Sequence, residues 1–168
     1  MFDGMWEDIK RSWTSGSMLY RLIWVNVVVF ILINAALILT NLGGIELPVG
    51  KEDGFGLATT SDLEVLMRRP WSIFTHMFAH VQIWHLIFNM ILLWWMGRIY
   101  QQEVGSRRLL STYLTGGLAG FMFYVFAYNI LPGLKAQIPL NGVSYALGSS
   151  AAVLSIFTAA ATLNPNKK

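Results

Sequence analysis

The sequence predicts an all-α membrane protein that crosses the bilayer several times, and two observations lead to this fold class. First, the chain is 55% hydrophobic and only 12% charged, with a mean hydropathy of +0.51, whereas a soluble domain usually carries about 25% charged residues. Second, a helix needs about 20 apolar residues to cross the hydrocarbon core, and four segments reach or nearly reach that length. These segments are residues 19–42, 80–100, 109–131 and 142–163.

Three sequence features place these segments in a bundle. Segment 19–42 is too long for the apolar part of a signal peptide and follows a polar stretch, so we interpret it as a retained helix. Segment 142–163 is rich in Ala, Ser and Gly, and small residues let helices approach closely. We therefore place it in the middle of the bundle. The GGLAG sequence at 116–120 has the spacing of a helix-packing motif.

The basic residues indicate how the chain is oriented in the membrane. If the four segments alternate in direction, eight of the twelve Lys and Arg residues fall on one side and four on the other. Cytoplasmic loops carry the excess of Lys and Arg, so we expect both termini in the cytoplasm. Residues 1–18 are then a cytoplasmic segment and residues 19–168 the membrane domain. The eight are Lys10, Arg11, Arg21, Arg98, Arg107, Arg108, Lys167 and Lys168, and the four are Lys51, Arg68, Arg69 and Lys135.

Composition also limits the classes of function. The chain has no cysteine, which excludes a disulfide framework, a thiolate metal site and a cysteine nucleophile. Its net charge is +3, and the basic residues cluster at the ends of apolar segments, so we expect the lipid bilayer as a partner and no nucleic acid. We expect no cofactor. The basic tail and the lack of a targeting segment favour a bacterial inner membrane.

A long loop, residues 43–69, follows the first segment and is expected to face outward. It is rich in Gly and acidic residues, and loops of this length are usually functional or disordered. It runs into RRPWSIF, where Arg, Pro and aromatic residues mix as in an interfacial segment. Trp71 is a candidate interface anchor, as are Trp94 and Trp95 further along the chain.

Polar side chains interrupt the apolar segments at two places. His85 and Asn89 are one turn apart on one helix face, and the GSSAA sequence at 148–152 is expected about two turns down the fourth segment. The Ser150 hydroxyl would then share a depth with an imidazole and a carboxamide. Serine can attack a carbonyl carbon, and such N–H groups can stabilise the oxyanion that develops. Gly148 would let the backbone or a substrate approach closely.

A purely structural interpretation stands beside the catalytic one. Serine and asparagine often form hydrogen bonds between helices in membranes, and His85 and Asn89 could do no more than that. By composition alone, Ser144, Ser149 and Ser155 are equal candidates to Ser150.

The three histidines also raise the question of a metal, because histidines four residues apart can bind one ion. They are His76, His80 and His85. Since no carboxylate or cysteine lies within the same turns, we expect no metal site.

Two stretches resemble motifs of a known family. WSIFTHMFAHVQIWHLIFNMILLWWMG at 71–97 resembles the second-helix signature of rhomboid intramembrane serine proteases, and GSSAAV at 148–153 resembles the Gly-x-Ser motif of their fourth helix. The order and separation of the motifs also match, and the resemblance covers about residues 19–163. It implies a rhomboid-like helical bundle with four of an expected six transmembrane helices. It also implies a serine endopeptidase that cleaves transmembrane protein substrates.

The resemblance assigns roles residue by residue. It implies that Ser150 is the nucleophile and that His85 and Asn89 stabilise the oxyanion. The family usually has Arg after its signature Trp, where this chain has Ser72, so the anchoring of the long loop needs another explanation. The supporting residues are Gly148, Ser149 as the variable middle residue of the motif, and His80 and His76 as structural or water-retaining groups.

The family's general base has no counterpart in this sequence. That base is a histidine on a sixth helix, downstream of the serine, whereas all three histidines here precede Ser150. Serine is a weak nucleophile without an adjacent base, so we expect these 168 residues alone to be inactive. We interpret them as the first four helices of a six-helix core, and favour a fragment over a naturally truncated relative.

Three classes of function therefore compete. The first is an intramembrane serine protease that acts through Ser150. The second is a catalytically inactive rhomboid-like protein that binds membrane clients, which the missing base favours and the intact His85 and Asn89 oppose. The third is a small transporter or channel subunit, which we rank last because charged residues would be expected within its helices. The sequence indicates neither the substrate nor the oligomeric state.

Overall fold

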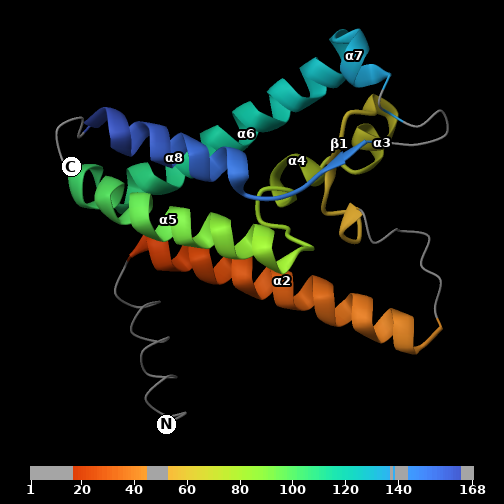
Figure 1. The fold of residues 1–168 in the computed structure, drawn as a ribbon, viewed down its shortest axis with the longest axis horizontal. Coiled ribbons are helices and arrows are strands. Elements are labelled where there is room, and N and C mark those ends of the chain that lie inside the picture. Colours follow the sequence, from red (N-terminus) through yellow and green to blue (C-terminus); the bar gives the residue numbers. More distant parts are fainter. Residues whose placement is uncertain (1–16, 45–52, 137, 139–143, 164–168) are drawn as a thin grey trace.

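The computed structural model of the chain describes residues 17–44, 53–136, 138 and 144–163. The described part is mostly helical and is built on four longer helices. In Figure 1, α2 and α5 run side by side, and α8 packs against both α5 and α6. The four helices are α2 (Met18–Leu42), α5 (Ile83–Val104), α6 (Ser106–Ile130) and α8 (Ser150–Leu163).

Glycine and proline set the boundaries of α5 and α6. Gly105 alone separates the two helices, and its φ of +88° turns the chain back, a conformation that glycine adopts without steric penalty. α6 ends before Pro132, because the residue ahead of a proline disfavours helical geometry. Leu131 is accordingly extended, with φ −85° and ψ 113°. Pro132 then begins the single turn of α7 (Pro132–Lys135).

Short elements gather at one end of the bundle, where the chain enters α5 and α8 (Figure 1). Two strands from distant parts of the sequence pair there as an antiparallel sheet, with Thr59 opposite Ala146 and Thr60 opposite Tyr145. This pairing fixes the chain ahead of α8. The short elements are β1 (Thr59–Thr60), α3 (Leu63–Arg68), α4 (Ser72–Thr75) and β2 (Tyr145–Ala146).

The described part of the long loop is anchored by Arg69 and Trp71. The Arg69 guanidinium lies 2.7 Å from the buried Asp53 carboxylate, and the Trp71 indole N–H donates to the Gly56 carbonyl oxygen at 3.0 Å. Arg69 thus provides the anchor that the sequence does not provide at Ser72. Residues 45–52 of the predicted loop lie outside the described residues.

The glycine motif at 116–120 lies where α6 meets α8, which confirms its predicted role in helix packing. A methyl group on Gly116 would collide with the Ser155 side chain, and one on Gly120 with the Ala151 side chain. The two helix backbones can approach so closely only because both positions lack a side chain.

The four predicted segments correspond to the four longer helices, but the predicted start of the last one is wrong. α8 begins at Ser150 and not at residue 142, because Tyr145–Ala146 forms a strand and Gly148 has a φ of +122°. Ser150 is therefore the first residue of α8 and does not lie two turns inside a helix. With 14 residues, α8 is about 21 Å long.

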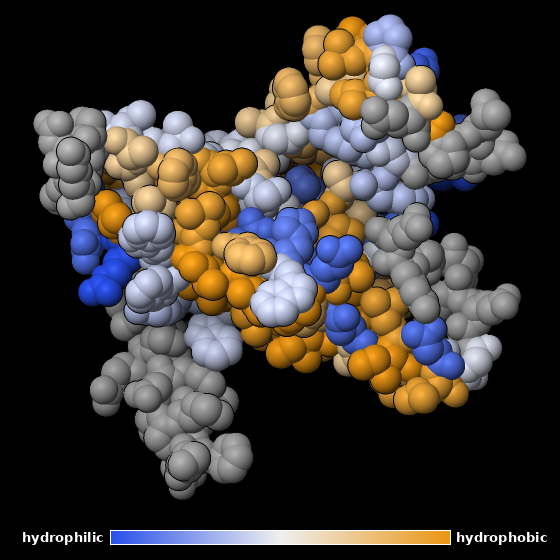
Figure 2. All heavy atoms as spheres, in the orientation of Figure 1, coloured by the Kyte–Doolittle hydropathy of each residue, from blue (hydrophilic) through white to orange (hydrophobic). Residues whose placement is uncertain are grey.

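Two described helices, α2 and α6, are long and apolar enough to cross a membrane by length and composition. The described structure supports the predicted all-α fold. Of the four predicted membrane-spanning helices, two pass this test of length and composition. Large apolar side chains are also exposed on the outside of the bundle, including Leu32, Phe88 and Phe123. In the view of Figure 2, orange hydrophobic residues cover much of α2 and the middle of α5.

Candidate active site

Ser149 and Ser150 lie in opposite environments although they are neighbours in sequence. Ser150 is exposed at the start of α8 and lines a cavity of about 150 Å³ that also borders His76, Gly120 and Tyr124. Ser149 is fully buried, with 0% of its surface exposed. Of these two serines, only Ser150 is therefore accessible from outside the protein.

Gly148 brings the backbone of this segment against an imidazole. Its N–H donates to the His76 carbonyl oxygen at 2.9 Å, and its φ of +122° is one that L side chains rarely adopt. A methyl group on Gly148 would lie 3.0 Å from Nε2 and 3.3 Å from Nδ1 of His85. The His85 ring thus packs directly on the glycine of the Gly-x-Ser sequence.

His80 connects the start of α5 to the same segment. Its Nε2 accepts a hydrogen bond from the Ser149 backbone N–H at 3.2 Å and lies 3.3 Å from the Ser149 Oγ. An imidazole nitrogen that accepts an N–H must be unprotonated, so the proton of neutral His80 is on Nδ1. That Nδ1 is buried and has no hydrogen-bond partner among the described residues.

The surroundings of His80 keep it neutral. The ring is fully buried and meets the His85 ring edge-on, with 5.2 Å between the ring centroids. Burial, with the nearby His85 as a second cause, lowers the pKa of His80 from 6.5 to about 4. His80 therefore acts as a hydrogen-bond acceptor for Ser149 at neutral pH.

His76, four residues before His80, also contacts the segment ahead of α8. Its Nδ1 lies 2.9 Å from the Ser72 carbonyl oxygen, its own carbonyl accepts the Gly148 N–H, and burial lowers its pKa. These contacts fit the supporting role that the sequence suggests for this histidine.

Asn89 lies one turn after His85 and is mostly buried. Its side-chain N–H donates to the His85 carbonyl oxygen at 2.8 Å, so part of its hydrogen-bonding capacity is used within α5. A carboxamide carries two N–H donors, and the second is what an oxyanion-stabilising role would require.

The other serines have structural contacts. The Ser144 hydroxyl lies 2.6 Å from the Tyr124 hydroxyl. The Ser155 hydroxyl donates to the Thr112 carbonyl oxygen on α6 at 3.0 Å and to Ala152 within its own helix at 2.7 Å. The interhelical role that the sequence left open for a serine thus applies to Ser155.

Sequence reasoning missed two polar residues beneath the site, Asn26 and Tyr113. Both are fully buried and are hydrogen-bonded to each other at 3.1 Å. Asn26 is one of three asparagines in the 25-residue apolar helix α2, with Asn34 and Asn41. Polar groups within such a segment require partners, and this was the available signal.

The arrangement can support acyl transfer. An accessible hydroxyl sits at the N-terminus of α8, whose unpaired N–H groups and dipole favour negative charge, next to a glycine backbone and an imidazole. In Figure 2, hydrophilic residues gather near the start of α5 within an otherwise orange surface. In the described part of the chain, no group of three or more His, Cys, Asp or Glu residues could hold a metal ion.

Comparisons with known proteins show which family the sequence matches. A family model described as the rhomboid domain matches residues 67–168. The chain is 32% identical over 84 residues to proteins named rhomboid protease GlpG from Salmonella newport (strain SL254) and Salmonella typhi. The aligned region is 49% of this chain and only 28% of those relatives, so the chain matches about a quarter of their length.

Proposed function

This chain belongs to the rhomboid family of membrane proteins, and from that premise we propose that it functions as an intramembrane serine endopeptidase with Ser150 as its nucleophile. The observation that carries the proposal is the contrast between two adjacent serines. Ser150 is exposed in a cavity at the start of α8, whereas Ser149 is buried against His80. A nucleophile that must reach a peptide carbonyl requires the first of these environments.

The reaction would proceed by acyl transfer. The Ser150 Oγ bonds to the carbonyl carbon of the substrate while a base takes its proton, and negative charge develops on the carbonyl oxygen. The bond to the leaving amine then breaks, the amine takes up a proton, and water hydrolyses the acyl-serine. We propose that His85 and Asn89 donate hydrogen bonds to the oxyanion, which is the usual source of a large part of the rate enhancement.

The contacts of His85 support this role. Its ring packs against Gly148, two residues before the nucleophile, so an oxygen bound near Ser150 would lie close to the imidazole. Asn89 shares the helix face of His85 and still has an N–H beyond the one given to the helix backbone.

The general base is not assigned to any histidine of this chain. His80 and His76 are buried and hold backbone groups of the Gly148–Ser149 segment, and His85 is assigned to the oxyanion. The proposal therefore requires a base from outside these three residues.

We also propose that α2, α5, α6 and α8 all lie across the membrane, with both chain ends in the cytoplasm of a bacterial inner membrane. The distribution of Lys and Arg supports this orientation, and the exposed apolar side chains of α2, α5 and α6 support lipid contact. The substrates would be transmembrane proteins cleaved near the outer end of their helices.

A second candidate is a catalytically inactive rhomboid-like protein that binds membrane clients. One observation favours it: His76 and His80 are buried and hold the backbone ahead of Ser150, and His85 packs on Gly148. Such a protein would bind the same transmembrane segments without cleaving them.

Cleavage of a reporter separates the two candidates. The complete reading frame that encodes this chain would be co-expressed in bacterial membranes with a tagged single-span reporter protein whose helix contains Gly and Ala near its outer end. Wild type would be compared with Ser150→Ala and, as the neighbouring control, Ser149→Ala.

The protease proposal predicts that Ser150→Ala abolishes cleavage and that Ser149→Ala retains part of it. If no variant cleaves and the reporter still co-purifies equally with wild type and Ser150→Ala, the inactive binder is the correct function. Cleavage that survives in Ser150→Ala would contradict the assignment of the nucleophile.

A further inference from the structure

A buried hydrogen-bonded pair connects the interior of the bundle to the segment that carries the candidate nucleophile. The Tyr113 hydroxyl, on α6, donates to the Met77 carbonyl oxygen at 2.7 Å. The same hydroxyl accepts a hydrogen bond from the Asn26 side chain, on α2, at 3.1 Å. Asn26 donates its other N–H to the Leu22 carbonyl oxygen at 2.8 Å. Each O–H and N–H donor of the Tyr113 and Asn26 side chains therefore has an acceptor, as burial requires.

Met77 belongs to the turn that holds the backbone just before α8. Within residues 76–80, the His76 carbonyl accepts the Gly148 N–H at 2.9 Å, and the His80 Nε2 accepts the Ser149 N–H at 3.2 Å. Two consecutive backbone donors ahead of Ser150 are thus bound by the same turn that Tyr113 binds at Met77.

The close approach of α6 to this turn depends on Gly117, one helical turn after Tyr113. A methyl group on Gly117 would lie 2.8 Å from Cε and 2.9 Å from Sδ of Met77, so the turn packs directly on the α6 backbone. Because residues four apart share a helix face, the same approach places the Tyr113 hydroxyl within reach of the Met77 carbonyl.

We propose that Tyr113, supported by Asn26, is a positioning residue for Ser150. It acts through the 76–80 turn, which fixes the backbone of Gly148 and Ser149 and so the direction of the side chain at position 150. A role of Tyr113 in catalysis rests on the proposed function. Its effect on the residue at position 150 can be measured without proteolytic activity.

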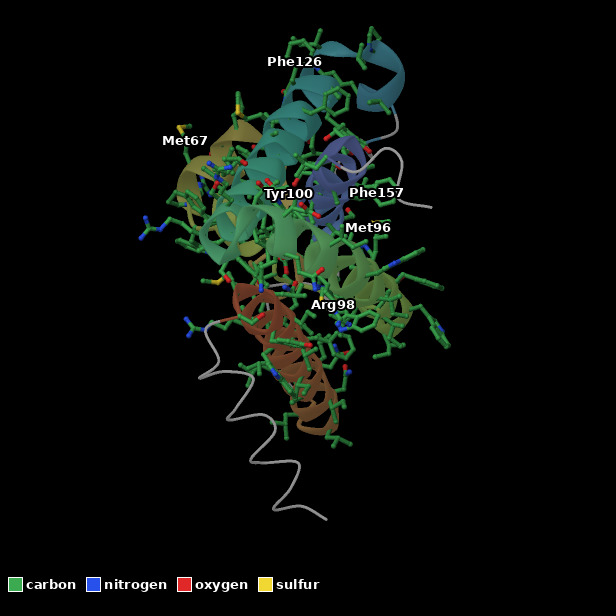
Figure 3. All side chains as sticks on the ribbon, turned by 90° about the vertical axis from the view of Figure 1, so that its left-hand side faces the viewer. Met67, Met96, Arg98, Tyr100, Phe126 and Phe157 are labelled. Carbon is green, nitrogen blue, oxygen red and sulfur yellow. The ribbon has the colours of Figure 1, made fainter. Side chains whose placement is uncertain are left out.

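A matched control exists on the neighbouring helix. The Tyr100 hydroxyl lies 2.9 Å from the Thr112 hydroxyl, so it also links α5 to α6 from a buried position. Tyr100 is at the far end of α5 from His85, near the turn into α6 (Figure 3). Tyr113→Phe and Tyr100→Phe each remove one hydroxyl and keep the ring, which in Tyr113 stacks on Phe78 at 5.5 Å.

The absence of cysteine from the sequence permits a direct probe of position 150. A single thiol would be introduced by Ser150→Cys, alone and combined with Tyr113→Phe, Asn26→Leu or Tyr100→Phe. The rate at which a methanethiosulfonate reagent converts this thiol into a mixed disulfide, with methanesulfinate as the leaving group, would be measured from pH 6 to pH 9 in detergent, alongside the thermal unfolding midpoint of each protein.

We expect Tyr113→Phe to lower the rate of mixed-disulfide formation at neutral pH by about threefold to tenfold, the range that corresponds to one lost hydrogen bond. The pH profile should move to higher pH, because the thiolate loses its alignment with the α8 N-terminus. Asn26→Leu should act in the same direction, and adding it to Tyr113→Phe should change little, since both act through one network. Tyr100→Phe should leave rate and profile within about twofold of the parent, as expected for a distant site.

Equal rates and profiles in the Tyr113→Phe and Tyr100→Phe proteins would overturn the proposal. If Tyr113→Phe fails to fold, Asn26→Leu, which leaves the bond from Tyr113 to Met77 in place, decides the same question. Thiol reactivity requires no proteolysis, so a protein that never cleaves a reporter would contradict the proposed function and leave this result unaffected.

Discussion

The imidazole of His85 lies directly on the backbone of Gly148, so close that a methyl group at position 148 would be 3.0 Å from its Nε2. This contact joins the first turn of α5 to the residue that precedes Ser149 and α8. It explains why residues 63 positions apart in sequence can form one site, and why the glycine of the Gly-x-Ser sequence has no room for a side chain.

Gly148→Ala is expected to reduce activity strongly. The new methyl group would push the His85 ring away, and the φ of +122° would be strained in any residue with a Cβ. We expect a loss of about 1–3 kcal/mol of stability and about a hundredfold of cleavage rate, a typical result of misplacing catalytic groups by about 1 Å. Reporter cleavage and thermal unfolding would measure both effects.

Gly133→Ala is the control for this substitution. Nothing lies within 4 Å of a methyl group at Gly133, and its φ is not in the left-handed region. Gly133→Ala should keep the stability and activity of wild type, and an equal loss of activity in the two variants would contradict the contact described above.

Arg69→Met is expected to destabilise the long loop, whereas Arg68→Met should not. Asp53 is buried, and its 2.7 Å ion pair with Arg69 is partly shielded from water, so removing the arginine leaves a buried charge unpaired. The 2.6 Å pair of Arg68 with Glu64 is largely exposed and contributes little. We expect losses of about 1–3 kcal/mol and under about 0.5 kcal/mol, respectively.

Limited proteolysis of the loop and thermal unfolding would distinguish the two arginine variants. Equal protease resistance in both would show that the Asp53 pair does not anchor the loop.

Gly120→Ala is expected to push α8 away from α6, because its methyl group would collide with the Ala151 side chain. Ala151 is the residue after Ser150, so both the unfolding midpoint and reporter cleavage should fall. Adding Ala151→Gly removes the colliding atom and should restore most of the activity. A double variant no better than Gly120→Ala would show that the loss has another cause.

Stability should decrease as the pH falls from about 6.5 to about 4, in part because of His80. Between these values the unfolded chain binds a proton at this histidine and the folded protein does not, since burial lowers the pKa of His80 to about 4. The folded state therefore loses up to about 3 kcal/mol across this window.

His80→Gln keeps an acceptor near the Nε2 position and does not titrate. Unfolding midpoints at pH 7 and pH 5 should differ less in this variant than in wild type. His76, whose pKa is also lowered by burial, would account for part of the remaining difference. The same pH dependence in both proteins would rule out His80 as a contributor.

Much of the fold was predictable because apolar length is a strong local signal. The boundaries of α2 agree with the apolar run to within one residue, and α6 starts and ends near Gly105 and Pro132. The start of α8 was not predictable in this way, because Tyr145 and Ala146 form a strand only through pairing with Thr60 and Thr59. Such long-range pairing leaves no trace in the hydropathy of one segment.

The candidate site was predictable in its parts and not in its contacts. The spacing of His85 and Asn89 placed them on one face, but the sequence could not distinguish Ser149 from Ser150 by environment. Burial of one and exposure of the other depend on where α8 begins and on the hydrogen bonds of His80. Asn26 and Tyr113 are 87 positions apart, so their hydrogen bond could not be predicted from the sequence either.

The central claim is that Ser150 is the reactive serine, and covalent labelling tests it most directly. Membranes containing the protein from its complete reading frame would be treated with a fluorophosphonate, and the modified residue identified by peptide mass spectrometry. The proposed mechanism predicts an adduct on Ser150 that disappears in Ser150→Ala and persists in Ser149→Ala. An adduct on Ser149, or labelling that survives in Ser150→Ala, would contradict it.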